Sequence, residues 1–201
     1  MTRAEDAIEV LDALSEGDVS VWLFGGWAVE AQISAARRPH RDVDLVVNAD
    51  DLERAQELVE RIGYTEQPDP DDPCEHLRFG RRRGDTLVQV SALRCGRTQL
   101  WLSVTARPGA RDSWLRCPPD GFPSEAQGCL CKRPVRCATP EVLLQSKLSW
   151  HSSRQVDLLD EDHLRSALSQ EQVERAEQNS NPLSRSCCDA DCEAVAGDLP
   201  R

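Results

Sequence analysis

The fold of this chain is decided by residues 21–47, which read VWLFGGWAVEAQISAARRPHRDVDLVV. Their first four residues form an apolar run that is typical of a strand buried on both faces. Gly25 and Gly26 separate that run from a helix predicted over 27–33. Glycines let a ligand approach the backbone, and the start of a helix offers unpaired N–H groups to a phosphate. The segment therefore predicts either a phosphate cradle or a tight turn.

The same segment ends in two acids that share one face of a second predicted strand. Residues 42–47 are rich in β-branched side chains, which favours a strand. On a strand, Asp42 and Asp44 project from one face with Cα atoms about 6.6 Å apart. Two carboxylates there repel each other unless a cation or a hydrogen-bond donor lies between them. A divalent-cation site is the functional interpretation, and a solvent-facing start of the strand is the alternative.

Hydrophobic periodicity and turn residues predict an α/β chain that ends in helices. Helices are predicted over 4–16 and 50–62, the second starting with a capping box at Asp50-x-x-Glu53. Strands are predicted at 76–79, 86–93 and 100–105, with the arginines 81–83 in a solvated hairpin turn and an irregular region over 107–134. Three helices should follow, one starting at Pro140, one with its apolar positions at Val156, Leu159 and Leu164, and one capped by Ser169 and Gln172. We expect an α/β domain over 1–138, a helical part over 139–178 packed on it, and a disordered tail over 179–201.

Composition narrows the classes of partner. The chain has 201 residues and a formal net charge of −11, from 24 basic and 35 acidic side chains. Such a surplus of acid disfavours nucleic acid, whose binding depends on Lys and Arg. No apolar run reaches the roughly 20 residues of a membrane span, and the N-terminus lacks the pattern of a signal peptide. We therefore expect a cytoplasmic protein, with its nine cysteines as incidental thiols rather than a zinc site.

The stretch GGWAVE…ARRPHRDVDLVV closely resembles the G-G-W-A…R-x-H-x-D-x-D-L signature of the aminoglycoside and lincosamide nucleotidyltransferases. These enzymes belong to the polymerase-β-like nucleotidyltransferase superfamily. The segments at 84–93, 133–150 and 154–164 are also similar to this family, more loosely, so the resemblance covers about residues 1–170.

The resemblance implies a nucleotidyltransferase-type mixed β-sheet flanked by helices. It places Gly25 and Gly26 at a nucleoside triphosphate, with Asp42 and Asp44 on Mg²⁺. The implied reaction transfers AMP from Mg-ATP to a hydroxyl of a small acceptor, an aminoglycoside- or lincosamide-like antibiotic. The surplus of acid would attract a cationic acceptor.

Four further residues of this sequence match positions of the family pattern. Arg38 matches an arginine that would meet a phosphate, and Lys147 matches a phosphate-binding lysine, although a surface lysine on a helix is an equal alternative. We expect His40 to be a local hydrogen-bonding residue and Trp27 to lie in the core.

One position departs from the family pattern. Aligning GDTLVQVSAL with the strand that carries the family's third carboxylate puts Gln89 at that position. A glutamine can offer its carbonyl oxygen to a cation, but it cannot accept a proton near pH 7. Asp85 would lie about 13 Å away along the strand, and Glu75 is another candidate. The chain is therefore predicted to be either an enzyme that uses another base or a catalytically degenerate, antitoxin-like module that binds nucleotide.

Overall fold

The computed structural model describes residues 1–33, 38–66, 77–96, 98–104, 110–150 and 154–186. The helices are α1 (Ala4–Glu16), α2 (Gly25–Ile33), α3 (Leu52–Arg61), α4 (Pro140–Trp150), α5 (Gln155–Ala167) and α6 (Gln170–Asn179), with a short 3₁₀ turn at Ala49–Asp51. The strands are β1 (Val21–Phe24), β2 (Asp42–Asn48), β3 (Thr65–Glu66), β4 (Arg78–Arg83), β5 (Thr86–Cys95), β6 (Leu100–Val104), β7 (Ala110–Cys117), β8 (Gly128–Leu130), β9 (Arg133–Val135) and β10 (Leu183–Ser186).

A mixed sheet forms the centre of the molecule. Its main path runs β1-β2-β5-β6-β7-β10, while β4 pairs with β5 and β3 pairs with β4. The pairing of β2 with β5 is parallel, and the other pairings in this sheet are antiparallel. This arrangement confirms the predicted α/β class with a mixed sheet flanked by helices.

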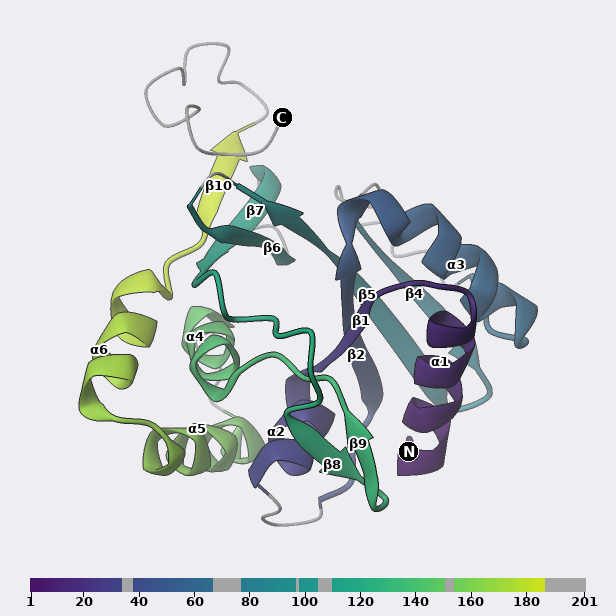
Figure 1. Cartoon of the computed structure of the whole chain (residues 1–201), viewed down its shortest axis with the longest axis horizontal. Helices are drawn as coiled ribbons and strands as arrows, with labels where there is room; N and C mark the ends of the chain where they lie inside the picture. Colours follow the sequence, from purple (N-terminus) through teal and green to yellow (C-terminus); the bar gives the residue numbers. More distant parts are fainter. Residues whose placement is uncertain (34–37, 67–76, 97, 105–109, 151–153, 187–201) are drawn as a thin grey trace.

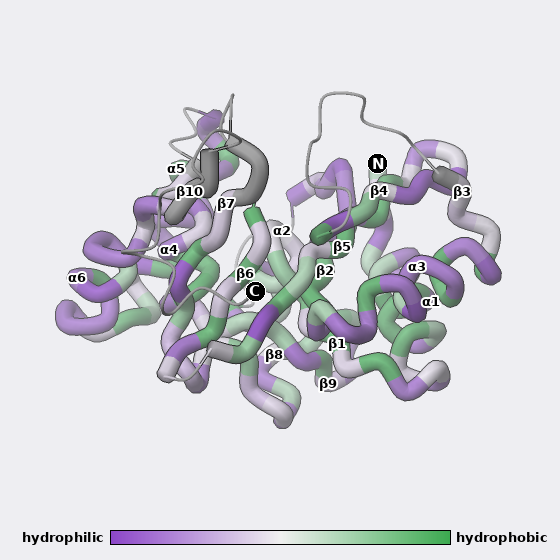
Figure 2. The backbone as a smooth tube through the Cα atoms, turned by 90° about the horizontal axis from the view of Figure 1, so that it is seen from above, coloured by the Kyte–Doolittle hydropathy of each residue, from purple (hydrophilic) through white to green (hydrophobic). Residues whose placement is uncertain are grey.

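Helices cover both faces of the sheet. Helices α1 and α3 lie on one face, and α2 and α4 lie on the other, with α5 and α6 packed outside α4 (Figure 1). Hydrophobic residues recur along the central strands β2 and β5, whereas the outer helix α6 is largely hydrophilic (Figure 2). On β2 and β5, one face is apolar and buried on the side of α1 and α3, through Val43, Leu45, Val88 and Val90. This fixes the face of the two strands that lies on the side of α2 and α4. The alternate residues Asp42, Asp44 and Gln89 therefore face α2.

Residues 136–138 hold the start of α4 beside β1 and α2. They run beside β1, where Leu23 donates its N–H to the carbonyl of Arg136 (2.8 Å) and Ala138 donates to the carbonyl of Leu23 (3.1 Å). The side chain of Gln32 on α2 also donates to the carbonyl of Ala138. Helix α4 starts at Pro140, as predicted, because Pro at the first helical position needs no N–H partner. The start of α4 is thus fixed next to Gly25.

The structure corrects three predictions about irregular segments. Residues 107–134 contain β7, β8 and β9 in their described part, so this region is not irregular throughout. Residues 183–186 form β10 and pair with β7, which contradicts a disordered tail over that stretch; the remaining tail, 187–201, lies outside the described residues. Helix α3 follows a 3₁₀ turn and starts after Asp51 without a side-chain cap, so the predicted capping box at Asp50 is wrong. In contrast, Ser169 and Gln172 form the predicted capping box of α6.

The arginine run is wrongly predicted as a turn. Arg81 and Arg83 are the last part of β4, and the turn is only Gly84-Asp85. Arg81 is buried and its Nε donates to Glu60 (2.8 Å). Arg83 donates to Glu9 (3.0 Å), so both side chains tie the sheet to the helices α3 and α1, although the side chain of Arg83 is still 36% exposed.

Of the three apolar positions predicted on α5, only Leu164 is buried. The buried residues of this helix are Asp157, Asp160 and Leu164, while Val156 and Leu159 are exposed. Two acids therefore take the positions that apolar side chains were expected to occupy.

No helix in the described ranges is long and apolar enough to cross a membrane. The division into an α/β part over 1–138 and a helical part over 139–178 stays a prediction.

Candidate active site

The backbone of Gly25 lies directly against the carboxylate of Asp44. In the antiparallel register of β1 and β2, Phe24 is opposite Asp44, so the chain turns into α2 just beside this acid. Gly25 has a φ of +59°, and a Cβ atom placed on it would lie 2.0 Å from Oδ2 of Asp44. Only glycine fits here, for reasons of both conformation and space. The predicted glycine break and the predicted acid strand thus form one site.

Asp42 and Asp44 fit a divalent cation. Both are partly buried on the same face of β2. Burial, together with the negative charge of Asp42, raises the pKa of Asp44 to about 7, and the cations Lys147, Arg154 and Arg38 oppose this shift. Oxygen ligands on two adjacent carboxylates are what Mg²⁺ takes in phosphate-binding sites. A cation between the two acids would remove the repulsion that raises this pKa.

His40 lies beside the first turn of α2, held by contacts on several sides. His40 is buried, and its backbone carbonyl accepts a hydrogen bond from the N–H of Thr2 (3.0 Å). Its ring stacks on Trp27 with centroids 4.0 Å apart, and its Nε2 donates to the carboxylate of Glu30 (3.0 Å). Burial lowers the pKa of His40, against the effect of Glu30. These contacts match the predicted structural role of His40 and the predicted core position of Trp27.

Gly26 leaves room for two of the side chains that sequence analysis singled out. A Cβ atom on Gly26 would lie 2.5 Å from Nη2 of Arg38 and 2.7 Å from Nδ1 of His40. Arg38 therefore packs against the first turn of α2, beside Gly25 and Asp44. The structure places Gly25 beside Asp44 and Gly26 beside Arg38, and Asp42 lies on the same face of β2 as Asp44.

Lys147 reaches the same region from α4. Its ammonium is bound by two acids of α5 that were not among the predicted site residues. Its Nζ lies 2.7 Å from Oδ1 of Asp157 and 2.9 Å from Oδ2 of Asp160, both on α5. Asp160 also accepts from Arg38, with Nη2 at 2.7 Å and Nε at 3.3 Å. A signal for these acids exists in the sequence, since their i, i+3 spacing matches a single helix face, the one that would also carry Leu164.

Gln89 lies beside Asp44 on the neighbouring strand. The parallel register pairs Asp44 with Gln89 and Asp42 with Leu87, so Gln89 is the neighbour of Asp44 on β5. Gln89 is exposed, and Asp85 lies in the turn before β5 rather than on its face. Glu75 falls outside the described residues. Within the described ranges, no three His, Cys, Asp or Glu side chains are grouped as a metal site would require.

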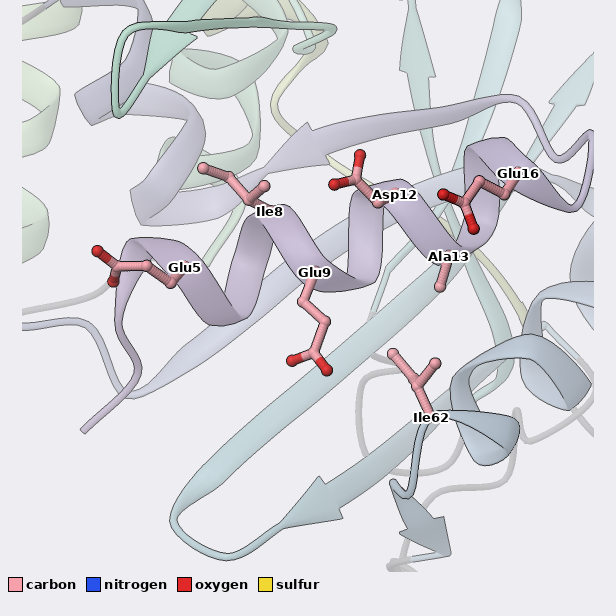
Figure 3. Close-up of a pocket in the computed structure, with 7 residues that line it drawn as sticks. All are labelled: Glu5, Ile8, Glu9, Asp12, Ala13, Glu16 and Ile62. Atoms are coloured by element: carbon pink, nitrogen blue, oxygen red, sulfur yellow. The ribbon is translucent and has the colours of Figure 1, made fainter.

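A shallow pocket on the other side of the sheet carries a second set of acids. Glu5, Glu9, Asp12 and Glu16 follow one another along α1, next to Ile62 (Figure 3). Glu9 is paired with Arg83 and Asp12 with Arg133, so much of this negative charge is neutralised within the protein. The pocket is separated from Asp44 by the sheet, and it is not part of the candidate site.

Comparisons with known proteins bear on the family of the chain. A protein-family model described as aminoglycoside-2''-adenylyltransferase matches residues 6–164. A 2''-aminoglycoside nucleotidyltransferase of Klebsiella pneumoniae is 27% identical over 138 residues, which are 68% of this chain and 67% of the relative. A lincosamide resistance protein of Staphylococcus haemolyticus is 34% identical over 55 residues, which are 27% of this chain and 34% of the relative.

Two solved structures share the fold. The crystal structure of ANT(2'')-Ia in complex with adenylyl-2''-tobramycin has a TM-score of 0.70 and 20% identity, covering 90% of this chain and 97% of the other. The lincomycin-bound crystal structure of the lincosamide antibiotic adenylyltransferase LnuA has a TM-score of 0.61 and 21% identity, covering 83% and 99%.

Proposed function

Because the chain belongs to the aminoglycoside-2''-adenylyltransferase family, we propose that it transfers AMP from Mg-ATP to a hydroxyl group of a small cationic antibiotic of the aminoglycoside type. The observation that carries this proposal is the contact of Gly25 with Asp44. A glycine cradle at a helix start, a pair of carboxylates and two cations meet at that point. The Klebsiella relative, named a 2''-aminoglycoside nucleotidyltransferase, supports the choice of acceptor class.

Each residue of the site has a role that its chemistry suits. Asp42 and Asp44 would hold Mg²⁺, which supplies positive charge to the phosphoryl oxygens when it is bound. Arg38 and Lys147 offset the remaining charge of the triphosphate, and the N–H groups at the start of α2 donate to it. The acceptor oxygen forms a bond to the α-phosphorus, the bond from that phosphorus to the bridging oxygen breaks, and pyrophosphate leaves.

The proton of the attacking hydroxyl has no acceptor at position 89. The amide of Gln89 cannot act as a base near pH 7, although its carbonyl can accept a hydrogen bond from the hydroxyl. In our proposal a base on the acceptor or the solvent takes this proton. General-base catalysis contributes about 10²–10⁴-fold in rate, so the native protein should turn over slowly.

A second candidate function follows from the same residue. With Gln89 beside Asp44, the chain would be a nucleotide-binding module of regulatory, antitoxin-like type without turnover. In that case Mg-ATP should stabilise the protein against thermal unfolding, while no pyrophosphate is released.

The experiment that separates these functions measures pyrophosphate release from Mg-ATP with tobramycin or lincomycin as acceptor. We expect acceptor-dependent release by the native protein, loss of release in Asp42→Ala, and a rate increased by about 10²-fold or more in Gln89→Asp. Asp162→Asn, an exposed acid on α5, is the charge-matched control. Binding of Mg-ATP without release in the native protein, together with release in Gln89→Asp, would favour the regulatory module. Neither binding nor release by the native protein would refute both functions.

A further inference from the structure

Two acids on α5 hold the cations of the candidate site. Asp160 accepts from Nε and Nη2 of Arg38 and lies 2.9 Å from Nζ of Lys147. Asp157 lies 2.7 Å from the same Nζ, and it also accepts from Nε of Arg154 (2.6 Å). Lys147 is thus bound by both acids, and Asp160 is the group that joins it to Arg38.

The acids lie beneath the cations, away from solvent. The side chains of Asp157 and Asp160 are 3% and 7% exposed, whereas those of Lys147 and Arg38 are 15% and 22% exposed. Each cation therefore keeps an open side while its carboxylate partner is covered. An incoming anion would meet the cations first, without displacing the acids.

The donor count of Lys147 leaves capacity for a phosphate. An ammonium group has three N–H donors and no acceptor. Among the described residues, the partners of this ammonium are Asp157 and Asp160, which account for two of its three donors. Among the described residues, Arg38 likewise bonds to Asp160 through Nε and Nη2, and its Nη2 packs against the first turn of α2 at Gly26.

The cations come from parts of the chain that nothing local brings together. Arg38 precedes β2, Lys147 lies on α4, and α5 packs against both α2 and α4. A guanidinium and an ammonium repel each other, so holding them side by side requires an anion between them. Asp160 is that anion. Because both of its carboxylate oxygens accept from Arg38, one from Nε and one from Nη2, the pair also fixes the plane of the guanidinium.

We propose that Asp160 is a positioning residue of the nucleotide site, because it holds Arg38 and Lys147 in one arrangement with their free donors available to the same triphosphate. This assignment rests on the proposed function only in requiring that the site binds a nucleoside triphosphate. The measurement of Kd below does not require turnover, so it applies to the enzyme and to the regulatory module alike, whereas the comparison of KM and kcat applies to the enzyme alone.

The test replaces Asp160 by Asn, which keeps the shape of the side chain and removes its charge. We expect the Kd for Mg-ATP, measured by calorimetry, to rise about tenfold, the scale seen when a partner that orients a binding group is lost. The KM for the antibiotic acceptor should change less than twofold. A purely structural role would instead reduce the active fraction, lowering kcat while both substrate constants stay unchanged. Asp162→Asn on the same helix should leave all three quantities as in the native protein.

Three outcomes would overturn the assignment. One is an unchanged Kd for Mg-ATP in a folded Asp160→Asn protein. Another is tighter binding of Mg-ATP, because that would mean Asp160 competes with the phosphates. The third is an equal rise in both substrate constants, because that would mean a general distortion of the site.

A second measurement covers the case in which Asp160→Asn does not fold. Arg38→Gln and Lys147→Gln are then combined, and the Kd for Mg-ATP is measured for each single variant and for the pair. Two cations that Asp160 positions jointly should give a combined loss smaller than the product of the single losses. Multiplicative losses would refute the positioning role. A native protein that binds no Mg-ATP refutes the proposed function itself, and this assignment with it.

Discussion

Replacing Gly25 by Ala tests whether the contact between the glycine turn and Asp44 makes the nucleotide site. The variant has two separate effects. The positive φ of +59° costs an L-residue about 1–2 kcal/mol of folding free energy. The new Cβ would also lie 2.0 Å from Oδ2 and 2.8 Å from Cγ of Asp44. Because non-bonded carbon and oxygen atoms do not approach closer than about 3 Å, the carboxylate must move by roughly 1 Å.

A shift of that size matters more for binding than for folding. Mg²⁺ accepts oxygen ligands at about 2.0–2.1 Å in near-ideal octahedral geometry, so a ligand displaced by about 1 Å no longer fits. Misplacement on this scale costs on the order of 10²-fold in function. We therefore expect Gly25→Ala to unfold at a lower urea concentration, which corresponds to a loss of about 1–2 kcal/mol in the free energy of unfolding. Its Kd for Mg-ATP should rise at least tenfold beyond any rise that this loss of stability explains.

Gly84→Ala is the matched control. Gly84 has nearly the same φ, +58°, but no atom lies within 4 Å of the Cβ position in the described structure. This variant should lose a similar amount of stability, measured by urea unfolding, and keep the full thermal shift produced by Mg-ATP. Equal Mg-ATP shifts in Gly25→Ala and the native protein would refute the reasoning, as would an equal loss of that shift in Gly84→Ala.

Two further predictions concern the layer opposite the site. Burial opposes ionisation of Asp6, but hydrogen bonds from the backbone and side chain of Arg3 outweigh it and lower the pKa of Asp6 below 3.8. The ionised acid therefore stabilises the fold above that pH, and this stabilisation is lost as the pH falls through the pKa of the folded state. Asp6→Ala should lower the free energy of unfolding by about 1–2 kcal/mol at pH 7, and urea titrations should show this difference shrinking at acid pH. Glu5→Ala, which removes an exposed acid from the same turn, should cost less than about 0.5 kcal/mol at pH 7. Arg81→Ala should lower the free energy of unfolding by roughly 1–2 kcal/mol, because it removes a buried, ion-paired side chain. Arg82→Ala should lower it by less than about 0.5 kcal/mol in the same urea assay. Similar losses in the two variants would contradict the buried role of Arg81.

Local patterns predicted the parts of the fold that the chain builds from neighbouring residues. The helix over 4–16, the strand over 21–24 and the strand from Asp42 were predicted correctly, since hydrophobic periodicity and β-branched content act within a few residues. The strand register then pairs Asp44 with Gln89, the residue that the family resemblance had placed at the third-carboxylate position.

Elements stabilised by distant partners were not predictable in this way. Strand β10 exists through its pairing with β7, about 70 residues earlier in the chain. Arg81 is buried because Glu60 of α3 neutralises it, and no residue close to it in sequence indicates that contact. The exposed Val156 and Leu159 on α5 show the same limit, since apolar side chains at helical spacing do not by themselves reveal which face a helix buries.

The sequence by itself determined that Asp42 and Asp44 share one face of a strand and that Gly25 and Gly26 separate the preceding strand from a helix. That these residues belong to one site, and that Gln89 stands where a third acid was expected, was implied by the resemblance to the nucleotidyltransferase family. Only the tertiary structure decided how the positive charges are held. Arg38 and Lys147 lie 109 residues apart, and they meet because α5 packs against α2 and α4 and inserts Asp160 between them. Burial makes that carboxylate effective, since charges attract more strongly where water is excluded, and burial is a property of the packed molecule alone.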